Sequence, residues 1–186
     1  MISKGNISLR RVKNVEADMI LLLKWLSDPE VLRWAYGEDA PWDLEKITAE
    51  FGEKTTGDGS TVGCFIAVDG EEIGYIQYFP IEEDSYKFSS REMYERVADG
   101  YGIDIFIGEP ELWGQGIGSR AVGLMADWLK NNTTAKLVCA DPATDNERGL
   151  RFWGKNGFQS IGLIENYDDS SKMSILMMRN QKYPTL

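Results

Sequence analysis

The chain has 186 residues, of which 42% are hydrophobic and 27% charged, a composition typical of a folded globular domain. Its formal net charge of −10 argues against nonspecific binding to nucleic acid or to an anionic membrane surface. The sequence contains no histidine, which excludes Ser-His-Asp and Cys-His triads, His-ligated metals and histidine proton shuttles, so proton transfer would depend on carboxylates, Tyr, Cys, Lys, backbone dipoles or water.

Hydrophobic spacing predicts the elements of the first half. Residues 6–13 form a strand, and residues 16–27 form a helix that ends before the Asp28-Pro29 break. A second helix begins after Asp43, a typical N-cap residue. The runs CFIAVDG and EEIGYIQYF form two strands around Asp69-Gly70, a dipeptide typical of hairpin turns. The first helix is expected to place one row of apolar residues on a single face, namely Met19, Ile20, Leu23 and Leu26.

In the second half, residues 80–99 have no clean strand pattern and indicate a variable loop or a short helix. Tyr101–Ile107 then alternates, with Asp104 and Phe106 on one face and isoleucines on the other, which predicts a strand. The remaining expected elements are a helix over 116–130, a strand over 136–140, a helix over 145–156 and strands over 159–164 and 173–179. This order predicts one mixed α/β domain over residues 1–186.

The acidic residues are unevenly distributed. Residues 37–99 hold 16 acids and 5 bases, a net charge of −11, whereas the rest of the chain has a net charge of +1. Such a stretch is either a solvated surface that aids solubility or an acidic rim that gathers a cationic partner. Both interpretations stay open at this point.

Cysteine usage and terminal composition indicate the compartment. Cys64 and Cys139 lie in separate apolar runs rather than in a CxxC pair, which fits a reducing environment. The first residues, MISKGNISLRRV, lack the apolar stretch of a signal peptide, and no apolar run is long enough to cross a bilayer. We expect a cytoplasmic protein without a metal or a membrane anchor, as a monomer or a homodimer.

The segment GIDIFIGEPELWGQGIGSRAVGLMADWL has the pattern of a ligand-binding site. A strand ends, and Gly114, Gly116 and Gly118 lead into a helix, so that backbone N–H groups and the positive end of the helix dipole would face a ligand. This arrangement suits a phosphate or pyrophosphate. A P-loop is excluded because no Gly-Lys-Ser/Thr follows, and a Rossmann unit is disfavoured because the strand lies after hairpin strands, about two-thirds along the chain.

These residues resemble the GCN5-related N-acetyltransferases (GNAT), whose acetyl-CoA signature is Arg/Gln-x-x-Gly-x-Gly/Ala. Here the signature runs from Trp113 to Gly118, with both glycines matched and the leading residue replaced by Trp. The segments ISLRRV, KWLSDPEVLRWAYGEDA, EEIGYIQYF, YGIDIFIG and ADPATDN together resemble the aminoglycoside 6'-N-acetyltransferases. The resemblance implies a mixed, mostly antiparallel sheet flanked by helices, with an acceptor-side half over about 1–99 and an acetyl-CoA-binding half over about 100–186.

The resemblance also implies a cofactor site. The strand near Ile105 and Ile107 would pair with pantetheine, and one of its N–H groups would polarise the thioester carbonyl. Asn146 would hydrogen-bond the pantetheine arm. The adenosine phosphates could meet Arg120, Arg151 and Lys155. For these bases, a solvated helix face is the competing interpretation. The CoA pyrophosphate would bind the backbone of one loop and helix start, namely Gln115, Gly116, Ile117, Gly118, Ser119 and Arg120.

Asp104 is the first candidate for the catalytic base. A carboxylate in the middle of a strand is costly to bury unless it is paired or functional. In the family, the matching aspartate lies at the amine site, where it could orient the ammonium and accept its proton. An edge position facing solvent is the alternative. Asp141 is the second candidate, against the alternative of a turn-forming Asp before Pro.

On the substrate side, the resemblance implicates aromatic and polar residues. Aromatic faces pack on sugar rings and carboxylates bind ammonium groups, with core packing as the competing role for each aromatic residue. The expected contacts are Trp34, Tyr36, Trp42, Glu38, Asp39, Gln77 and Asp104. One position departs from the family: Trp153 stands where many members have the Tyr that protonates the thiolate, so the general acid is another tyrosine or water, or the thiolate leaves unprotonated.

The resulting hypothesis is an acetyl-CoA-dependent N-acetyltransferase. It would act on a polycationic small amine, with the 6'-amino group of an aminoglycoside implied by the resemblance, by direct attack in a ternary complex. Alternatives are acetylation of a protein N-terminus or a polyamine, or a CoA-binding regulatory protein that has lost catalysis, for which Trp153 is the only hint.

Overall fold

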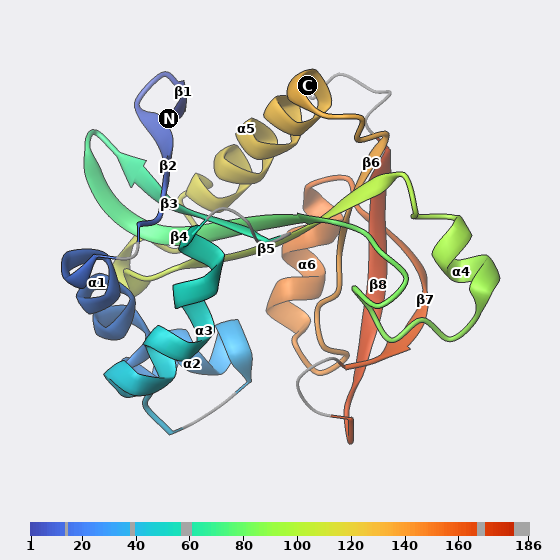
Figure 1. Cartoon of the computed structure of the whole chain (residues 1–186), viewed down its shortest axis with the longest axis horizontal. Helices are drawn as coiled ribbons and strands as arrows, with labels where there is room; N and C mark the ends of the chain where they lie inside the picture. The colour runs from blue at the N-terminus through green and yellow to red at the C-terminus, as the bar shows by residue number, and fades with distance from the viewer. Residues whose placement is uncertain (14, 38–39, 57–60, 167–169, 181–186) are drawn as a thin grey trace. The chain divides into compact units, whose positions relative to one another are not determined.

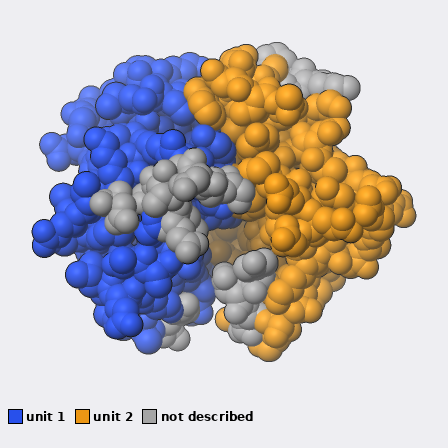
Figure 2. All heavy atoms as spheres, in the orientation of Figure 1, with its two compact units in different colours: residues 1–78, 104–125 blue, residues 79–103, 126–186 orange. Residues whose placement is uncertain are grey.

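The computed structural model describes residues 1–13, 15–37, 40–56, 61–166 and 170–180. The chain forms two compact units, which Figure 2 distinguishes by colour: residues 1–78 with 104–125, and residues 79–103 with 126–186. The two halves expected from the sequence, about 1–99 and 100–186, were defined by the ligand that each would bind, not by which residues pack together. That division stays a prediction. Within the described residues, no helix is both long and apolar enough to cross a membrane.

The strands of the first unit are antiparallel neighbours in chain order (Figure 1). The hairpin formed by the strands 62–68 and 71–80 has its turn at Asp69 and Gly70. The φ angles of these two residues are 52° and 93°, and a two-residue turn of type I′ requires positive φ angles at both positions. The turn pairs Val68 with Glu71, which confirms the predicted hairpin. The four strands are β1 (Ile2–Lys4), β2 (Ile7–Arg11), β3 (Val62–Val68) and β4 (Glu71–Pro80), of which β1 was not predicted.

Three helices of this unit pack on an aromatic core: α1 (Glu16–Leu26), α2 (Pro29–Tyr36) and α3 (Leu44–Thr56). The helix expected over 16–27 is confirmed, but its buried face was predicted wrongly in part. Ile20 is 50% exposed, whereas Leu22 and Trp25 are fully buried. The buried row is rotated because Trp25, the largest side chain of α1, lies in the core with Met19, Leu22 and Leu26.

Helix α2 was missed because one dipeptide has two roles. Asp28 and Pro29 end α1, but the Asp28 carboxylate also accepts hydrogen bonds from the backbone N–H of Glu30 (2.8 Å) and of Val31. Pro29 occupies the first helical turn, where its missing N–H costs nothing. The helix ends at Gly37, whose φ of 69° is left-handed. The N-cap predicted at Asp43 is confirmed by its hydrogen bond from the N–H of Lys46.

In the second unit the strand order is β5-β6-β8-β7. The start of β5 pairs with β6 in parallel, over Gly100–Gly102, whereas β6 with β8 and β8 with β7 are antiparallel. Both units thus have mostly antiparallel strands together with helices, and the predicted mixed α/β class is confirmed. The unit boundaries divide β5 (Gly100–Ile107) before Asp104 and α5 (Ile117–Asn132) after Met125. The elements wholly within the second unit are α4 (Arg91–Glu95), β6 (Leu137–Ala140), α6 (Glu147–Lys155), β7 (Gln159–Glu165) and β8 (Met173–Asn180).

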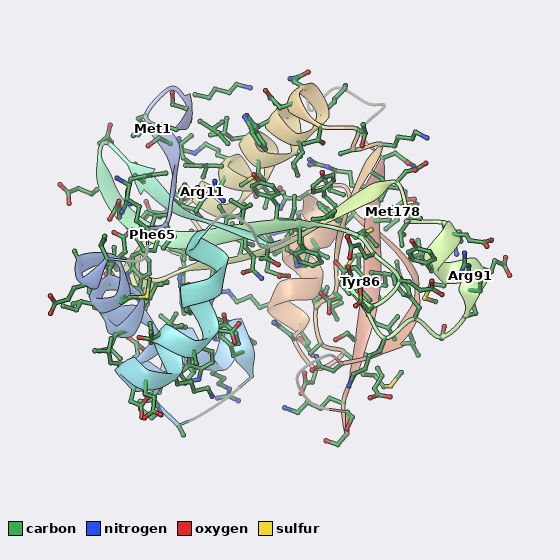
Figure 3. The ribbon with its side chains drawn as sticks, viewed as in Figure 1. Met1, Arg11, Phe65, Tyr86, Arg91 and Met178 are labelled. Carbon is green, nitrogen blue, oxygen red and sulfur yellow. The ribbon has the colours of Figure 1, made fainter. Side chains whose placement is uncertain are left out.

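Residues 80–99 contain the short helix α4 and follow the outer edge of β7. Lys87 forms a β-bridge with Glu165, and their side chains form an ion pair at 2.8 Å. Further along, the Arg96 guanidinium donates to the carbonyl of Ile161. Tyr86 of this segment, labelled in Figure 3, is 4% exposed and belongs to the hydrophobic core of the second unit. Residues 80–99 are therefore anchored on β7, the edge strand of the sheet.

Candidate active site

Two strands of the first unit present a shared polar and aromatic face. Tyr75 and Gln77 are two residues apart on β4 and so point to the same side. The ring of Tyr75 stacks on that of Phe106 of β5, with centroids 5.5 Å apart. Beside this pair, Gln77 Nε2 donates a hydrogen bond of 2.7 Å to Asp104 Oδ2. The structure thus brings together two residues predicted from the sequence, Gln77 and Asp104.

Tyr75 is a site residue that the sequence analysis missed. Its hydroxyl donates to Gln77 Oε1 at 2.8 Å, so three side chains form a series from the core to the half-buried Asp104. Tyr75 is only 2% exposed. Burial raises the pKa of Tyr75 well above its usual value, and the negative charge of the Asp104 carboxylate adds to this effect. The sequence feature that could have identified Tyr75 is its spacing of two residues from Gln77 in a predicted strand, which places both side chains on the same face.

A row of aromatic rings connects this face to the helices. Tyr36 contacts Trp42 (centroids 4.4 Å apart), Trp42 contacts Phe51 (6.4 Å), and Phe51 packs edge-on against Tyr75 (5.1 Å). Trp42 is 4% exposed, and the Lys46 ammonium lies over its ring, so its role in this structure is packing. Tyr36, by contrast, is half-buried at the end of the row.

The other predicted acceptor-side residues differ in placement. Trp34 is 36% exposed, and the Arg33 guanidinium lies over its ring at 5.9 Å. Glu38 and Asp39 lie outside the described residues. Some acidic residues of the stretch 37–99 form ion pairs within it: Glu83 and Glu95 both pair with Arg91, which Figure 3 labels.

The end of β5 is held tightly against α1. At Gly108 an added Cβ would lie 2.2 Å from the Trp25 ring, so only glycine fits there. The next residue, Glu109, accepts hydrogen bonds from the Trp25 indole N–H (2.9 Å) and from the Lys24 ammonium. Partial burial acts to raise the pKa of Glu109, but these two donors outweigh it and lower that pKa. The loop that follows therefore starts from a fixed point.

The glycine loop then leads into α5. Trp113 donates its indole N–H to the carbonyl of Ile107 at 2.8 Å, while Gly114 and Gly116 have left-handed φ angles of 77° and 76°. The N–H of Arg120 bonds the carbonyl of Gly116, which marks the first helical hydrogen bond. The preceding N–H groups, of residues 117–119, precede this first bond and have no acceptor in an α-helix. The first turn of α5 is fully described and contains no acid that would compete for an anion.

The β5 backbone beside this loop has a defined direction. The N–H of Gly108 bonds the carbonyl of Ile73 in β4. Because backbone groups alternate sides along an antiparallel strand, the N–H and C=O groups of Ile105 and Ile107 point away from β4. Of the predicted cofactor residues on the loop, Gln115, Gly116 and Arg120 are exposed, whereas Ile117 is buried. Gln115 donates to the carbonyl of Glu111, and the Arg120 guanidinium donates to Asn6 Oδ1 at 2.8 Å.

The remaining predicted residues belong to the second unit. Asp141 follows β6 and is half-buried. Asn146 is the N-cap of α6, where its side-chain oxygen accepts from the N–H of Gly149 at 2.8 Å. Lys155 is exposed at the end of α6, and Arg151 pairs with Glu147. Trp153 of α6 is 6% exposed and packs against the rings of Phe152 and Phe158, so its side chain is part of the hydrophobic core.

Residues 14–166 match the family described as "Acetyltransferase (GNAT) domain". The chain belongs to the GNAT acetyltransferase family. It is 25% identical over 166 residues to the aminoglycoside N(6')-acetyltransferase type 1 of Klebsiella pneumoniae, covering 89% of this chain and 80% of that protein. It is 27% identical over 143 residues to the N-acetyltransferase 9-like protein of Caenorhabditis briggsae, covering 74% and 68% of the two chains.

A solved structure supports the fold of this GNAT protein. The aminoglycoside acetyltransferase AAC(6')-Ib in complex with ribostamycin and coenzyme A has a TM-score of 0.76 at 24% identity, and the match covers 95% of this chain and 94% of that one. The predicted fold and the predicted acetyltransferase class are therefore confirmed. The amine that this GNAT enzyme acetylates is a separate question.

Proposed function

We propose that this GNAT enzyme transfers the acetyl group of acetyl-CoA to a primary amine of a polycationic small molecule, namely the 6'-amino group of an aminoglycoside. The hydrogen bond between Gln77 and Asp104 is the main support, because it places an oriented carboxylate on the strand that leads into the glycine loop. The Klebsiella pneumoniae relative, whose name gives the aminoglycoside 6'-amine as acceptor, supports the choice of substrate class. Antibiotic resistance is the biological role that this activity would have.

The cofactor binds along β5 and the start of α5. Backbone N–H groups over residues 115–120 hold the pyrophosphate, since the left-handed Gly114 and Gly116 allow close approach and the helix dipole favours an anion. Pantetheine pairs with the β5 backbone, whose groups at Ile105 and Ile107 point away from β4. The carbonyl of Ile107 already accepts from Trp113, so its N–H is the group offered to the ligand.

Two further cofactor contacts are proposed on the resemblance to the family. Asn146 bonds the pantetheine arm through its amide N–H₂, because its oxygen caps α6. Lys155 is exposed and meets an adenosine phosphate.

Asp104 acts on the incoming ammonium. It orients the substrate nitrogen and accepts one proton, directly or through water, and the free amine then attacks the thioester carbon. A C–N bond forms, and an N–H donor of β5 stabilises the oxyanion. The nitrogen then releases its second ammonium proton to water, and the C–S bond breaks when the tetrahedral intermediate collapses. The thiolate leaves unprotonated or takes its proton from water, because Trp153 is packed in the core and has no acidic group. Asp141 is the alternative base.

The acceptor-side residues recognise the rest of the substrate. Tyr36, half-buried at the end of the aromatic row, and Trp34, at the surface, provide faces on which a sugar ring can pack. Gln77 keeps its place beside Asp104. Glu38 and Asp39 are proposed to attract the remaining ammonium groups of the substrate.

A thiol-release assay tests the proposal. Acetyl-CoA is supplied with matched aminoglycosides that carry either an amino or a hydroxyl group at the 6' position, with spermidine, and with peptides that have a free N-terminus. We expect turnover only with the 6'-amino compounds. Turnover confined to spermidine or peptides would support the corresponding alternative acceptor. No turnover, together with a raised melting temperature in acetyl-CoA, would point to a CoA-binding protein without catalysis.

A further inference from the structure

The polar series behind Asp104 extends into the core. Tyr75 donates to Gln77 Oε1 at 2.8 Å, and Gln77 Nε2 donates to Asp104 Oδ2 at 2.7 Å. From these contacts we infer that Tyr75 is a positioning residue for Asp104 and acts through the Gln77 amide. The inference deepens the proposed function and rests on it, since it assumes that Asp104 meets the amine.

The chemistry of the amide explains why both hydrogen bonds matter. A carboxylate is only an acceptor, so Asp104 requires the amide to turn its N–H₂ group outward. Gln77 Oε1 is then turned toward the core, where an amide oxygen without a donor is costly. The Tyr75 hydroxyl supplies that donor. Without it, the Gln77 side chain would gain by leaving this rotamer, and its hydrogen bond to Asp104 would weaken.

Tyr75 itself is held in one position. Its ring lies between Phe51 and Phe106, with centroid distances of 5.1 and 5.5 Å. Across the ladder, Gly63 of β3 pairs with Gln77, and a Cβ at Gly63 would lie 2.5 Å from the Tyr75 hydroxyl oxygen. The hydroxyl therefore occupies the space that any other residue at position 63 would fill. Burial also keeps Tyr75 protonated, because its raised pKa leaves it a donor at the pH of the reaction.

The consequence concerns the direction of the carboxylate. Bound at Oδ2, the Asp104 carboxylate cannot rotate about its Cβ–Cγ bond without breaking the hydrogen bond to Gln77. The line along which it meets the ammonium is thereby set before the substrate arrives. Such preorganisation is valuable because a misplacement of about 1 Å can cost about 100-fold in rate.

A double-mutant cycle between Tyr75→Phe and Gln77→Met tests this inference. Phe keeps the ring and removes only the hydroxyl. We expect Tyr75→Phe to lower kcat for the 6'-amine about tenfold, with KM for acetyl-CoA unchanged. In the Gln77→Met background the same change should alter kcat less than about twofold, because the connection is already broken. Tyr86→Phe, at a tyrosine that is 4% exposed in the second unit, is the matched control and should leave kcat unchanged.

Equal losses in both backgrounds would show a merely structural role and overturn the inference, as would an unchanged kcat in the single variant. A second readout needs no substrate: the side-chain N–H₂ resonance of Gln77 should shift in Tyr75→Phe and not in Tyr86→Phe. If the unmodified enzyme acetylates no amine, the proposed function fails. The resonance then decides the positioning by itself, and an unchanged signal in Tyr75→Phe overturns it.

Discussion

The indole N–H of Trp113 donates to the carbonyl of Ile107 at 2.8 Å and thereby ties the glycine loop back to the strand that precedes it. Trp113 stands at the leading position of the acetyl-CoA signature, where the family has Arg or Gln. The substitution thus keeps a side-chain N–H donor at this position, and the departure from the signature has a structural purpose in this chain. The hydrogen bond also removes one acceptor from the β5 backbone.

Replacing Trp113 with Phe should weaken cofactor binding. The loss of one hydrogen bond costs about 1 kcal/mol, so KM for acetyl-CoA should rise about fivefold while KM for the amine stays the same. Steady-state kinetics with each substrate varied in turn measures both values. Trp128→Phe, on the later part of α5, is the control. A change in KM for the amine alone would mean that Trp113 serves the acceptor side.

Asp104→Asn should lower kcat about 100-fold or more, because the amide cannot accept the proton of the ammonium. The affinity for acetyl-CoA, measured by calorimetry, should hardly change. Asp99→Asn is the control: its carboxylate is paired with Lys136 at the surface, and kcat should be unaffected. Asp141→Asn separates the two candidate bases, and a larger loss there than at Asp104 would transfer the role to Asp141.

Because the Cys64 thiol is buried, we expect the free energy of unfolding to decline at alkaline pH. Burial raises the pKa of this thiol from about 9 to about 11. Above pH 9 the unfolded chain releases this proton while the folded chain retains it, so the free energy of unfolding falls as the pH rises toward 11. The slope is about 1.4 kcal/mol per pH unit for one such group. Urea unfolding of the wild type and of Cys64→Ala at pH 8, 9 and 10 measures it; parallel curves for the two proteins would contradict this assignment.

The buried Asp18 should contribute strongly to stability. Its carboxylate is 6% exposed and accepts two hydrogen bonds of 3.0 Å from Arg10 and one of 2.7 Å from the N–H of Lys13. Asp18→Ala leaves these donors without their acceptor and should lower the free energy of unfolding by about 2 kcal/mol. Glu16→Ala, exposed in the same helical turn, should change it by less than about 0.5 kcal/mol, as urea titration would show.

Local patterns in the sequence predicted most of the fold. Alternation placed Asp104 and Phe106 on one face of β5, and the Asp69-Gly70 turn located the hairpin, because both signals depend on residues close in sequence. Tyr75 could not be selected in this way: a tyrosine in a strand is ordinary, and its meaning depends on Gly63 from the neighbouring strand. The same limit applies to Trp42, whose burial depends on α3.

The anchoring of residues 80–99 on β7 has a practical consequence for protein engineering. The bridge from Lys87 to Glu165 and the hydrogen bond from Arg96 to Ile161 occupy backbone groups of the edge strand β7. A shortened variant lacking α4 would present those groups, beside the exposed Leu163, to any other extended chain. Trimming this segment to obtain a smaller catalyst would therefore yield a protein that aggregates during purification.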